Sequence, residues 1–228
     1  MKTSNIIVVS LIASITLIIT SGMMEFRLKG VPAGSVLHKT SGIRQTPIPQ
    51  FHAVVVQHYP NVSLDVSDAF NLGTIGLPES IPGLSYEVKN DTLYIKGSPD
   101  DPRPEFVNIS APAQQIKELR AFNSHVIVNN PSLDRFVVHS DNANVSINTL
   151  ETISTLVVEG VNNARIDFLQ SSAVHTLDLN LDHSEIYTSG SLGSVKGSIK
   201  NQSRANLSNA NALTFTRDST SYLQVWTN

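Results

Sequence analysis

The side chains best suited to chemistry in this sequence recur about every 20 residues along its second half. They form two rows, of which the first is Arg165, Glu185, Arg204 and Tyr222 and the second is Asp167 and Tyr187. Carboxylates beside a basic residue are the groups that polysaccharide lyases and hydrolases use as metal ligands, acids or bases. Arginine and tyrosine can equally grip anionic groups and stack on rings without any reaction. The rows are therefore candidates for catalysis or for recognition.

Charge pairing favours recognition over catalysis. A catalytic pair of carboxylates must hold two different protonation states, which requires burial or a close like charge. Asp167 and Glu185 are instead expected on an exposed strand face beside Arg165 or Arg204, which keeps both carboxylates ionised. We predict no enzymatic activity, and a carbohydrate-active enzyme remains the alternative. A third reading is a solvated charge ladder without a function of its own.

The composition excludes several other kinds of chemistry. The chain contains no cysteine, so disulfides, thiolate zinc sites and cysteine nucleophiles are absent. Its seven histidines show no metal-ligand spacing, and we expect no metal and no cofactor. A net charge of −3 provides no basic field for a nucleic acid. Asn, Ser and Thr together outnumber the charged residues, which is typical of turns and strands.

A repeat of about 20 residues must position the two rows. Its anchor is a small residue that precedes an apolar alternation, at Ser124, Ala143, Ala164, Ser184, Ser203 and Ser221. The second and fourth residues after each anchor are mostly apolar, as in Val126 and Val128, so the candidate rows occupy the outward positions one and three residues after it. The residue before each anchor is polar, at Asn123, Asn142, Asn163, His183, Gln202 and Thr220. We expect these side chains to stack as a ladder at one turn.

A period of this length fits one coil of a parallel β-helix, in which each rung buries its apolar face only by stacking on the next. An antiparallel sandwich is the alternative, but it does not require the same polar residue type at the same phase. A second inward row is predicted at Leu119, Phe136, Leu156, Leu177, Val195 and Phe215. The row three residues before it is Ile116, Leu133, Ile153, Val174, Leu192 and Ala212. Arg217 would then occupy the inward position that Val138 has in its coil. Because a buried unpaired charge is costly, the last coil should open at Arg217 and leave this side chain at the rim of the β-helix.

Other segments flank the repeat. Residues 84–97 have the alternation and the Asn90-Asp91 turn of an antiparallel hairpin. Residues 113–122 look helical in isolation, yet Leu119 falls on a repeat row and predicts a strand from that residue. The last strand, near 222–226, should have one unpaired edge that either pairs with another chain or is shielded. The predicted divisions are a leader at 1–24, a linker at 25–49 and a β-helix domain at 50–228.

The leader determines the expected location. Residues 6–24 are uncharged and apolar enough to span a bilayer as a signal anchor, and a cleaved signal peptide is the competing interpretation. A strict positive-inside count would leave the domain in the cytoplasm. A short leader before a domain rich in Ser, Thr and Asn is nevertheless the usual build of an exported protein. We therefore expect an inner-membrane anchor with a periplasmic domain, or a secreted or outer-surface domain if the leader is cleaved.

Three segments, FHAVVVQHYPNVSLDV, LSYEVKNDTLYIKG and FVNISAPAQQIKELRAFNSHVIV, precede the coils in this order. With the coils, over about 48–228, they resemble the auto-transporter adhesin head GIN domain family of bacterial envelope proteins. The resemblance implies a right-handed parallel β-helix in the cell envelope and an adhesive or binding role, and it carries over no catalytic residue. The sequence analysis thus predicts an envelope-anchored β-helix that presents a surface to an unknown protein or glycan. The alternatives are a carbohydrate-active enzyme and a self-polymerising scaffold of the bactofilin kind.

Overall fold

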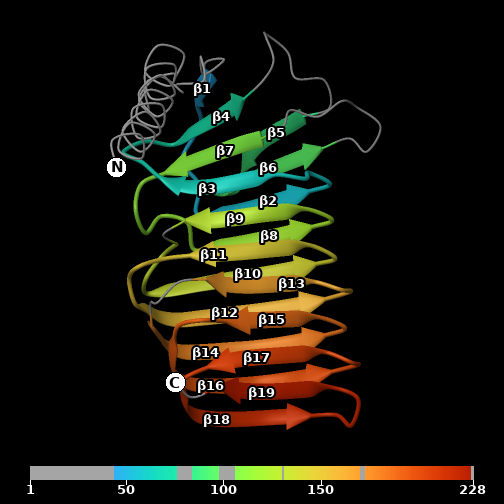
Figure 1. Cartoon of the computed structure of the whole chain (residues 1–228). Coiled ribbons are helices and arrows are strands. Elements are labelled where there is room, and N and C mark those ends of the chain that lie inside the picture. The colour runs from blue at the N-terminus through green and yellow to red at the C-terminus, as the bar shows by residue number, and fades with distance from the viewer. Residues whose placement is uncertain (1–43, 76–83, 98–105, 130, 170–172, 227–228) are drawn as a thin grey trace, which may run out of the picture. The chain divides into compact units, whose positions relative to one another are not determined.

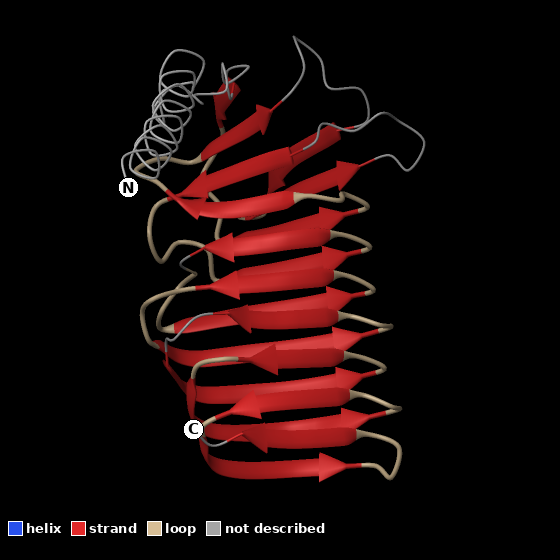
Figure 2. Cartoon of the chain, in the orientation of Figure 1, coloured by secondary structure: helices blue, strands red, loops and turns tan. Residues whose placement is uncertain are grey.

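The computed structural model describes residues 44–75, 84–97, 106–129, 131–169 and 173–226, and these residues form strands and the turns between them. In this part of the chain two sheets run the length of the domain (Figures 1 and 2). Sheet A contains, in spatial order, β1 (Arg44–Pro47), β4 (Asn71–Ile75), β7 (Phe106–Ala111), β3 (Val62–Val66), β9 (His125–Asn129), β11 (Asn144–Asn148), β13 (Arg165–Leu169), β15 (Glu185–Thr188), β17 (Arg204–Ser208) and β19 (Tyr222–Trp226). Sheet B contains β18 (Ala210–Arg217), β16 (Ser191–Lys200), β14 (Ala173–Asp182), β12 (Ile153–Val161), β10 (Arg135–Asp141), β8 (Glu118–Phe122), β2 (Ala53–Gln57), β6 (Thr92–Gly97) and β5 (Leu84–Lys89).

Each coil consists of one strand from each sheet. From β8–β9 to β18–β19 the chain alternates between the sheets, and every strand pairs in parallel with the strand one coil away. This architecture is a parallel β-helix, as the repeat predicts. The anchors Ser124, Ala143, Ala164, Ser184, Ser203 and Ser221 are all buried where the chain turns from sheet B into sheet A. A small residue is needed there because the corner leaves little room beside the stacked coils.

The core lies between the two sheets. The inward positions of sheet A keep the predicted register, so that Val126, Val145 and Ile166 stack on one another and are buried. In sheet B the central part of the predicted row is confirmed, because Phe136 pairs with Leu156 and Leu156 pairs with Leu177.

The predicted sheet B row is wrong at both ends. Leu119 pairs with Val138 rather than Phe136, and Val195 pairs with Leu213 rather than Phe215. The same slip places Ala210, not Ala212, beside Leu192. A slip of two residues keeps each side chain on the same face of the sheet, so hydrophobic alternation cannot detect it.

Arg217 is affected by the same slip. It pairs with Ile199 and not with the row that contains Val138. Its side chain is exposed at the last described coil, as expected from the cost of burying an unpaired charge.

The first coils do not stack in chain order. β2 lies between β6 and β8 in sheet B, and β3 lies between β7 and β9 in sheet A. The predicted hairpin is confirmed, because β5 pairs with β6 in antiparallel fashion. β1 and β4 are antiparallel additions to sheet A, and β1 lies within the segment predicted as a linker. The strand β8 also confirms the expectation of strand rather than helix around Leu119.

Within the described residues no helix is long and apolar enough to cross a membrane. The predicted signal anchor, residues 6–24, lies outside those residues, so it stays a prediction.

The predicted polar ladder follows the turn from sheet B into sheet A. Asn123, Asn142, Asn163, His183 and Gln202 all have positive φ, between 46° and 64°, and Asn and short polar residues tolerate this left-handed region best. Asn142 donates its side-chain amide to the Asn123 carbonyl oxygen, Oδ1, over 2.6 Å. Two later turns contain an extra left-handed residue, Asn162 or Asn201. There the side-chain hydrogen bond between coils is made by this extra residue, which precedes the ladder residue, and it runs to Asp141 or Asp182.

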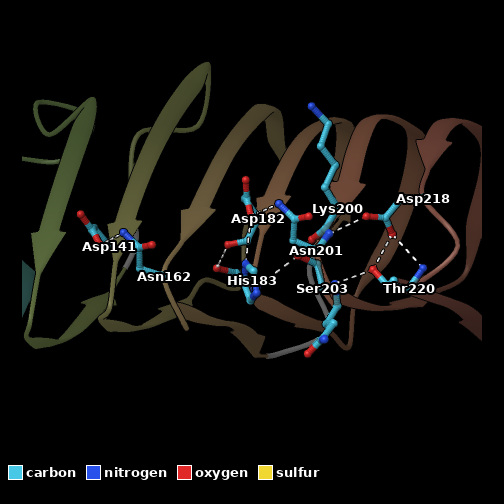
Figure 3. A network of polar contacts seen from close by, with 11 residues as sticks. Asp141, Asn162, Asp182, His183, Lys200, Asn201, Ser203, Asp218 and Thr220 are labelled. Carbon is cyan, nitrogen blue, oxygen red and sulfur yellow. Dashed lines mark hydrogen bonds and ion pairs between the residues drawn. The ribbon is translucent and has the colours of Figure 1, made fainter.

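Asn201 ties three coils together (Figure 3). Its side-chain amide donates to Asp182 Oδ1 over 2.8 Å, and its backbone N–H donates to Asp218 Oδ2 over 2.6 Å. The bond from the Asn201 backbone, helped by bonds from Ser221 and Thr220, holds the pKa of the Asp218 carboxyl well below its usual range. The side-chain bond from Asn201 likewise lowers the pKa of Asp182.

These bonds predict an acid-sensitive last coil. Because the folded-state pKa of Asp218 is lowered, its contribution to stability is fully present above the ordinary carboxyl pKa of about 4 and is lost as the pH falls below it. The melting temperature of the native protein should therefore exceed that of Asp218→Ala at pH 6, and the gap should narrow as the pH approaches 3. A gap of constant size across this range would contradict the assignment.

Candidate functional site

The candidate rows lie on the outer face of sheet A, in the predicted register. Arg165 pairs with Glu185, Glu185 with Arg204, and Arg204 with Tyr222. Asp167 pairs with Tyr187 in the neighbouring row. The structure thus brings all of the predicted site residues onto four consecutive strands, β13, β15, β17 and β19. The inward residues of β13 and β17 are buried in the core, and those of β19 are partly buried.

Arg165 is the centre of this surface. Its Nε lies 3.0 Å from Asp167 Oδ2, two residues along the same strand, and its guanidinium stacks over the Tyr187 ring at 4.8 Å from the centroid. The hydrogen bond and charge of Asp167 raise the pKa of the Arg165 guanidinium above its already high ordinary value. A guanidinium held on a carboxylate and an aromatic face is fixed in orientation and presents its remaining donors outward.

The neighbouring strands repeat the pattern in part. The Tyr187 hydroxyl donates to Glu185 Oε2 over 2.9 Å, and the Tyr222 hydroxyl donates to Gln224 Oε1 over 3.0 Å. Arg204 lies over the Tyr222 ring at 5.9 Å, and among the described residues it forms no ion pair. The predicted alternation of Arg165, Glu185 and Arg204 is present in register, but the close contacts run along each strand or to a tyrosine ring instead of across that row.

A hollow of about 320 Å³ borders Arg165 and Glu185 at the turn into sheet A. Its other lining residues are Asn144, Asn163, Ala164, His183, Ser184 and Gln202. The polar ladder therefore has a second role here, because amide and imidazole groups of adjacent coils converge on a space beside the stacked arginine. Planar hydrogen-bonding groups next to an aromatic ring suit a sugar or another polar ligand.

The two acidic residues of this surface each contact a different neighbouring side chain. Asp167 accepts from Arg165 and Glu185 accepts from Tyr187, so the two carboxylates are engaged in different contacts. Both side chains lie on the outer face of the sheet and are partly exposed. In the described part of the chain no group of three or more His, Cys, Asp or Glu side chains could hold a metal ion.

Sequence reasoning missed a charged cluster on the outer face of sheet B. His139 Nδ1 lies 2.6 Å from Glu159 Oε2, and Arg120 Nε lies 2.6 Å from Glu118 Oε1. A hollow of about 360 Å³ adjoins this cluster, with Phe122 in its lining. The spacing of 20 residues between His139 and Glu159 was a usable signal. The predicted row sets Arg120 beside Val137, whereas in the structure Arg120 pairs with His139.

A second missed cluster occupies the outer face of sheet A near β3. Asp65 accepts hydrogen bonds from Ser63 Oγ over 2.8 Å, from Asn129 Nδ2 over 2.6 Å and from Asn108 Nδ2. Asn148 extends the row by donating to Asn129 over 3.1 Å. These groups satisfy one another, so the cluster holds adjacent coils in register.

Comparisons with known proteins identify the fold. No model of a known protein family and no curated protein sequence matches the chain. Among solved structures, a candidate adhesin from Bacteroides fragilis aligns with a TM-score of 0.62 and 12% identity, over 81% of this chain and 96% of that one. A candidate lipid-binding protein from Parabacteroides distasonis aligns with a TM-score of 0.41 and 11% identity, over 82% and 94% of the two chains. A candidate adhesin from Parabacteroides merdae aligns with a TM-score of 0.38 and 13% identity, over 82% and 92%.

Proposed function

We propose that the chain is a non-catalytic, envelope-anchored β-helix that binds a partner through the outer face of sheet A. The observation that carries this proposal is Arg165, fixed between Asp167 and the Tyr187 ring beside a hollow lined by polar side chains. A rigid guanidinium and an aromatic ring, presented on a face that is itself fixed by the core, can bind without rearranging.

The chemistry of the face favours an anionic glycan as the partner. Arg204 is exposed and, within the described residues, contacts a tyrosine ring rather than a carboxylate. It can therefore pair with a carboxylate or sulfate group of the ligand. Tyr187 and Tyr222 offer ring surface for stacking, and the hollow beside Glu185 offers amide donors and acceptors for hydroxyl groups. Stacked coils repeat these groups at about 4.8 Å, which suits an extended chain.

The envelope location rests on the leader and on fold-level likeness. Residues 6–24 have the length and apolarity of a signal anchor, which would leave the β-helix on the exported side of the inner membrane. Cleavage of the leader would release the domain instead. The Bacteroides fragilis protein with the same fold is a candidate adhesin, which supports an adhesive role. Membership of the adhesin head GIN domain family is part of this proposal.

The double variant Arg165→Ser with Arg204→Ser tests the binding face. We expect the full chain in detergent to bind immobilised polygalacturonate at about 50 mM NaCl and to lose affinity at about 500 mM, because salt screens exposed charges. The double variant should bind at least about tenfold more weakly at low salt, with an unchanged melting temperature, because both side chains lie outside the core. Surface plasmon resonance measures the affinities, with neutral dextran as the comparison surface.

The matched control is Arg135→Ser with Arg217→Ser, which removes the same charge from exposed positions away from the face. It should bind almost as well as the native chain. Equal losses in the two double variants would mean that only net charge matters, and that result would overturn the assigned face. Release of reducing or unsaturated sugar ends, abolished by Asp167→Asn or Glu185→Gln, would replace the proposal with a carbohydrate-active enzyme.

A further inference from the structure

The strand β19 has an outer edge that no described strand pairs. The Tyr222 N–H donates to the Ser203 carbonyl over 2.8 Å, and the Trp226 carbonyl accepts from the Asn209 N–H over 2.7 Å, so both residues direct their backbone groups toward β17. Alternate residues of a strand direct these groups to opposite sides. The N–H and C=O groups of Leu223 and Val225 therefore point to the outer edge.

Of the other outer strands, β1 and β5 are protected against edge pairing, and β18 contains one charged residue, Arg217, whereas β19 contains none. Proteins protect such edges with charged residues and proline. At the opposite end of the domain β1 contains Arg44 and Pro47, and β5 contains Glu87 and Lys89. The sequence of β19, YLQVW, contains neither charge nor proline, and Tyr222, Val225 and Trp226 are of types with high strand propensity.

We infer that two copies of this chain pair through β19, antiparallel, about a twofold axis at Gln224. This register sets Leu223 opposite Val225 of the second copy, and these are the residues whose backbone groups face the edge. Each such pair exchanges two hydrogen bonds, so the twofold axis generates four. A shift of one residue in either copy would oppose groups that already bond to β17.

The side chains of β19 complement themselves in the same register. Tyr222 and Trp226 are 49% and 57% exposed on the outer face, and the twofold axis sets each opposite the other. Aromatic pairs across antiparallel strands are among the favourable ones. Leu223 and Val225 continue the inward rows and are only partly buried, while Leu213 of β18 is 42% exposed. A second copy stacked on this end would cover the open end of the core.

The pairing has a consequence for binding. The twofold axis of an antiparallel pair is perpendicular to the sheet, so both copies would turn the outer face of sheet A in the same direction. The two sets of Arg165, Arg204 and Tyr222 would then lie on one continuous surface. A long glycan could contact both sets, and the second contact would be intramolecular. This effect would add to the proposed binding function, whereas the pairing itself does not depend on it.

Cysteine crosslinking tests the twofold axis, because the native chain contains no cysteine. Residues opposed at a non-hydrogen-bonded antiparallel position have Cα atoms about 4.5 Å apart, which is within disulfide range. The full-length variant Gln224→Cys in detergent should therefore form a disulfide dimer under mild oxidation. The matched control is Asn206→Cys, one strand inward at the paired position of the same outer row. It should remain uncrosslinked on a non-reducing gel.

A charge at the axis should separate the copies without unfolding them. Gln224→Lys sets two like charges opposite each other and should weaken dimerisation at least about tenfold in sedimentation equilibrium. Asn206→Lys should sediment like the native chain. A native chain that is monomeric up to about 100 μM would overturn the proposal. Crosslinking of Gln224→Cys no more efficient than that of Asn206→Cys would also overturn it, and this result would be expected if another segment or protein covered β19.

Discussion

Replacement of Leu156 by Asp is expected to prevent folding. Leu156 is 1% exposed and lies in the middle of the β-helix, between Phe136 and Leu177 of the neighbouring coils. A buried, unpaired carboxylate costs several kcal/mol, a large part of the roughly 5–15 kcal/mol by which a domain is stable. Each coil is stabilised by its neighbours, so a defect at a central rung also separates the two halves of the stack. Circular dichroism of the purified variant should show no cooperative melting transition.

The milder variant Leu156→Ala allows the loss of stability to be measured. It should fold and lose about 2–5 kcal/mol through reduced burial and a cavity, as measured by urea denaturation. Thr155→Asp is the matched control for Leu156→Asp, because Thr155 lies on the outer face of the same strand, paired with Arg135 of the neighbouring strand. A carboxylate there should change stability by less than about 1 kcal/mol. An unchanged melting temperature for Leu156→Asp would show that the rung register is wrong.

The second large effect is expected at Gly197. This residue lies in β16 with a φ of +141°, a conformation that side chains rarely adopt. A Cβ added there would lie 1.8 Å from the backbone oxygen of Leu179 in the preceding coil. Gly197→Ala combines conformational strain of about 1–3 kcal/mol with a displacement of the neighbouring backbone. We expect a total loss above about 3 kcal/mol in urea denaturation.

Gly160→Ala serves as the comparison for Gly197→Ala. Gly160 lies in β12 of the same sheet and is buried, but its added Cβ would meet side-chain atoms of Leu181, Ile166 and Ser184 at 3.0–3.2 Å. The side-chain ends of Leu181 and Ile166 can move by a few tenths of an ångström, so a loss of about 1 kcal/mol is expected. Equal losses in the two variants would mean that the backbone contact at Gly197 does not decide its stability effect.

Much of the candidate site could be predicted from the sequence, because the outward rows follow directly from the repeat. In sheet A the anchors Ser124 to Ser221 mark one corner of each coil from β8–β9 to β18–β19, and the sheet A strand begins at the next residue. The distance from the anchor to each outward residue is constant, so Arg165, Glu185 and Arg204 are placed in one row without any knowledge of the turns. The contacts within the row could not be predicted, because a flexible arginine side chain can reach several neighbouring side chains at similar distances. Only the structure shows that Arg165 meets Asp167 and Tyr187.

The sheet B rows are less predictable because the anchors lie after them in the chain. Strand lengths and turns vary there between coils, and a slip of two residues preserves the burial pattern. The pairings of Leu119 and Val195 were therefore wrong, and the contact between His139 and Glu159 was missed as a site. The order of the first coils could not be predicted for a similar reason. Nothing in local periodicity shows that β2 lies between β6 and β8, because any apolar rung can stack on any other.

By itself the sequence determined the kind of fold, the inward and outward faces and the residues of the candidate surface, because the alternation of a strand and a period of about 20 residues are local properties that repeat. The tertiary structure alone decided which rungs are neighbours at the first coils and which turn residues share hydrogen bonds. These features depend on contacts between residues far apart in the chain, for which many arrangements bury a similar apolar area and only the complete packing distinguishes them.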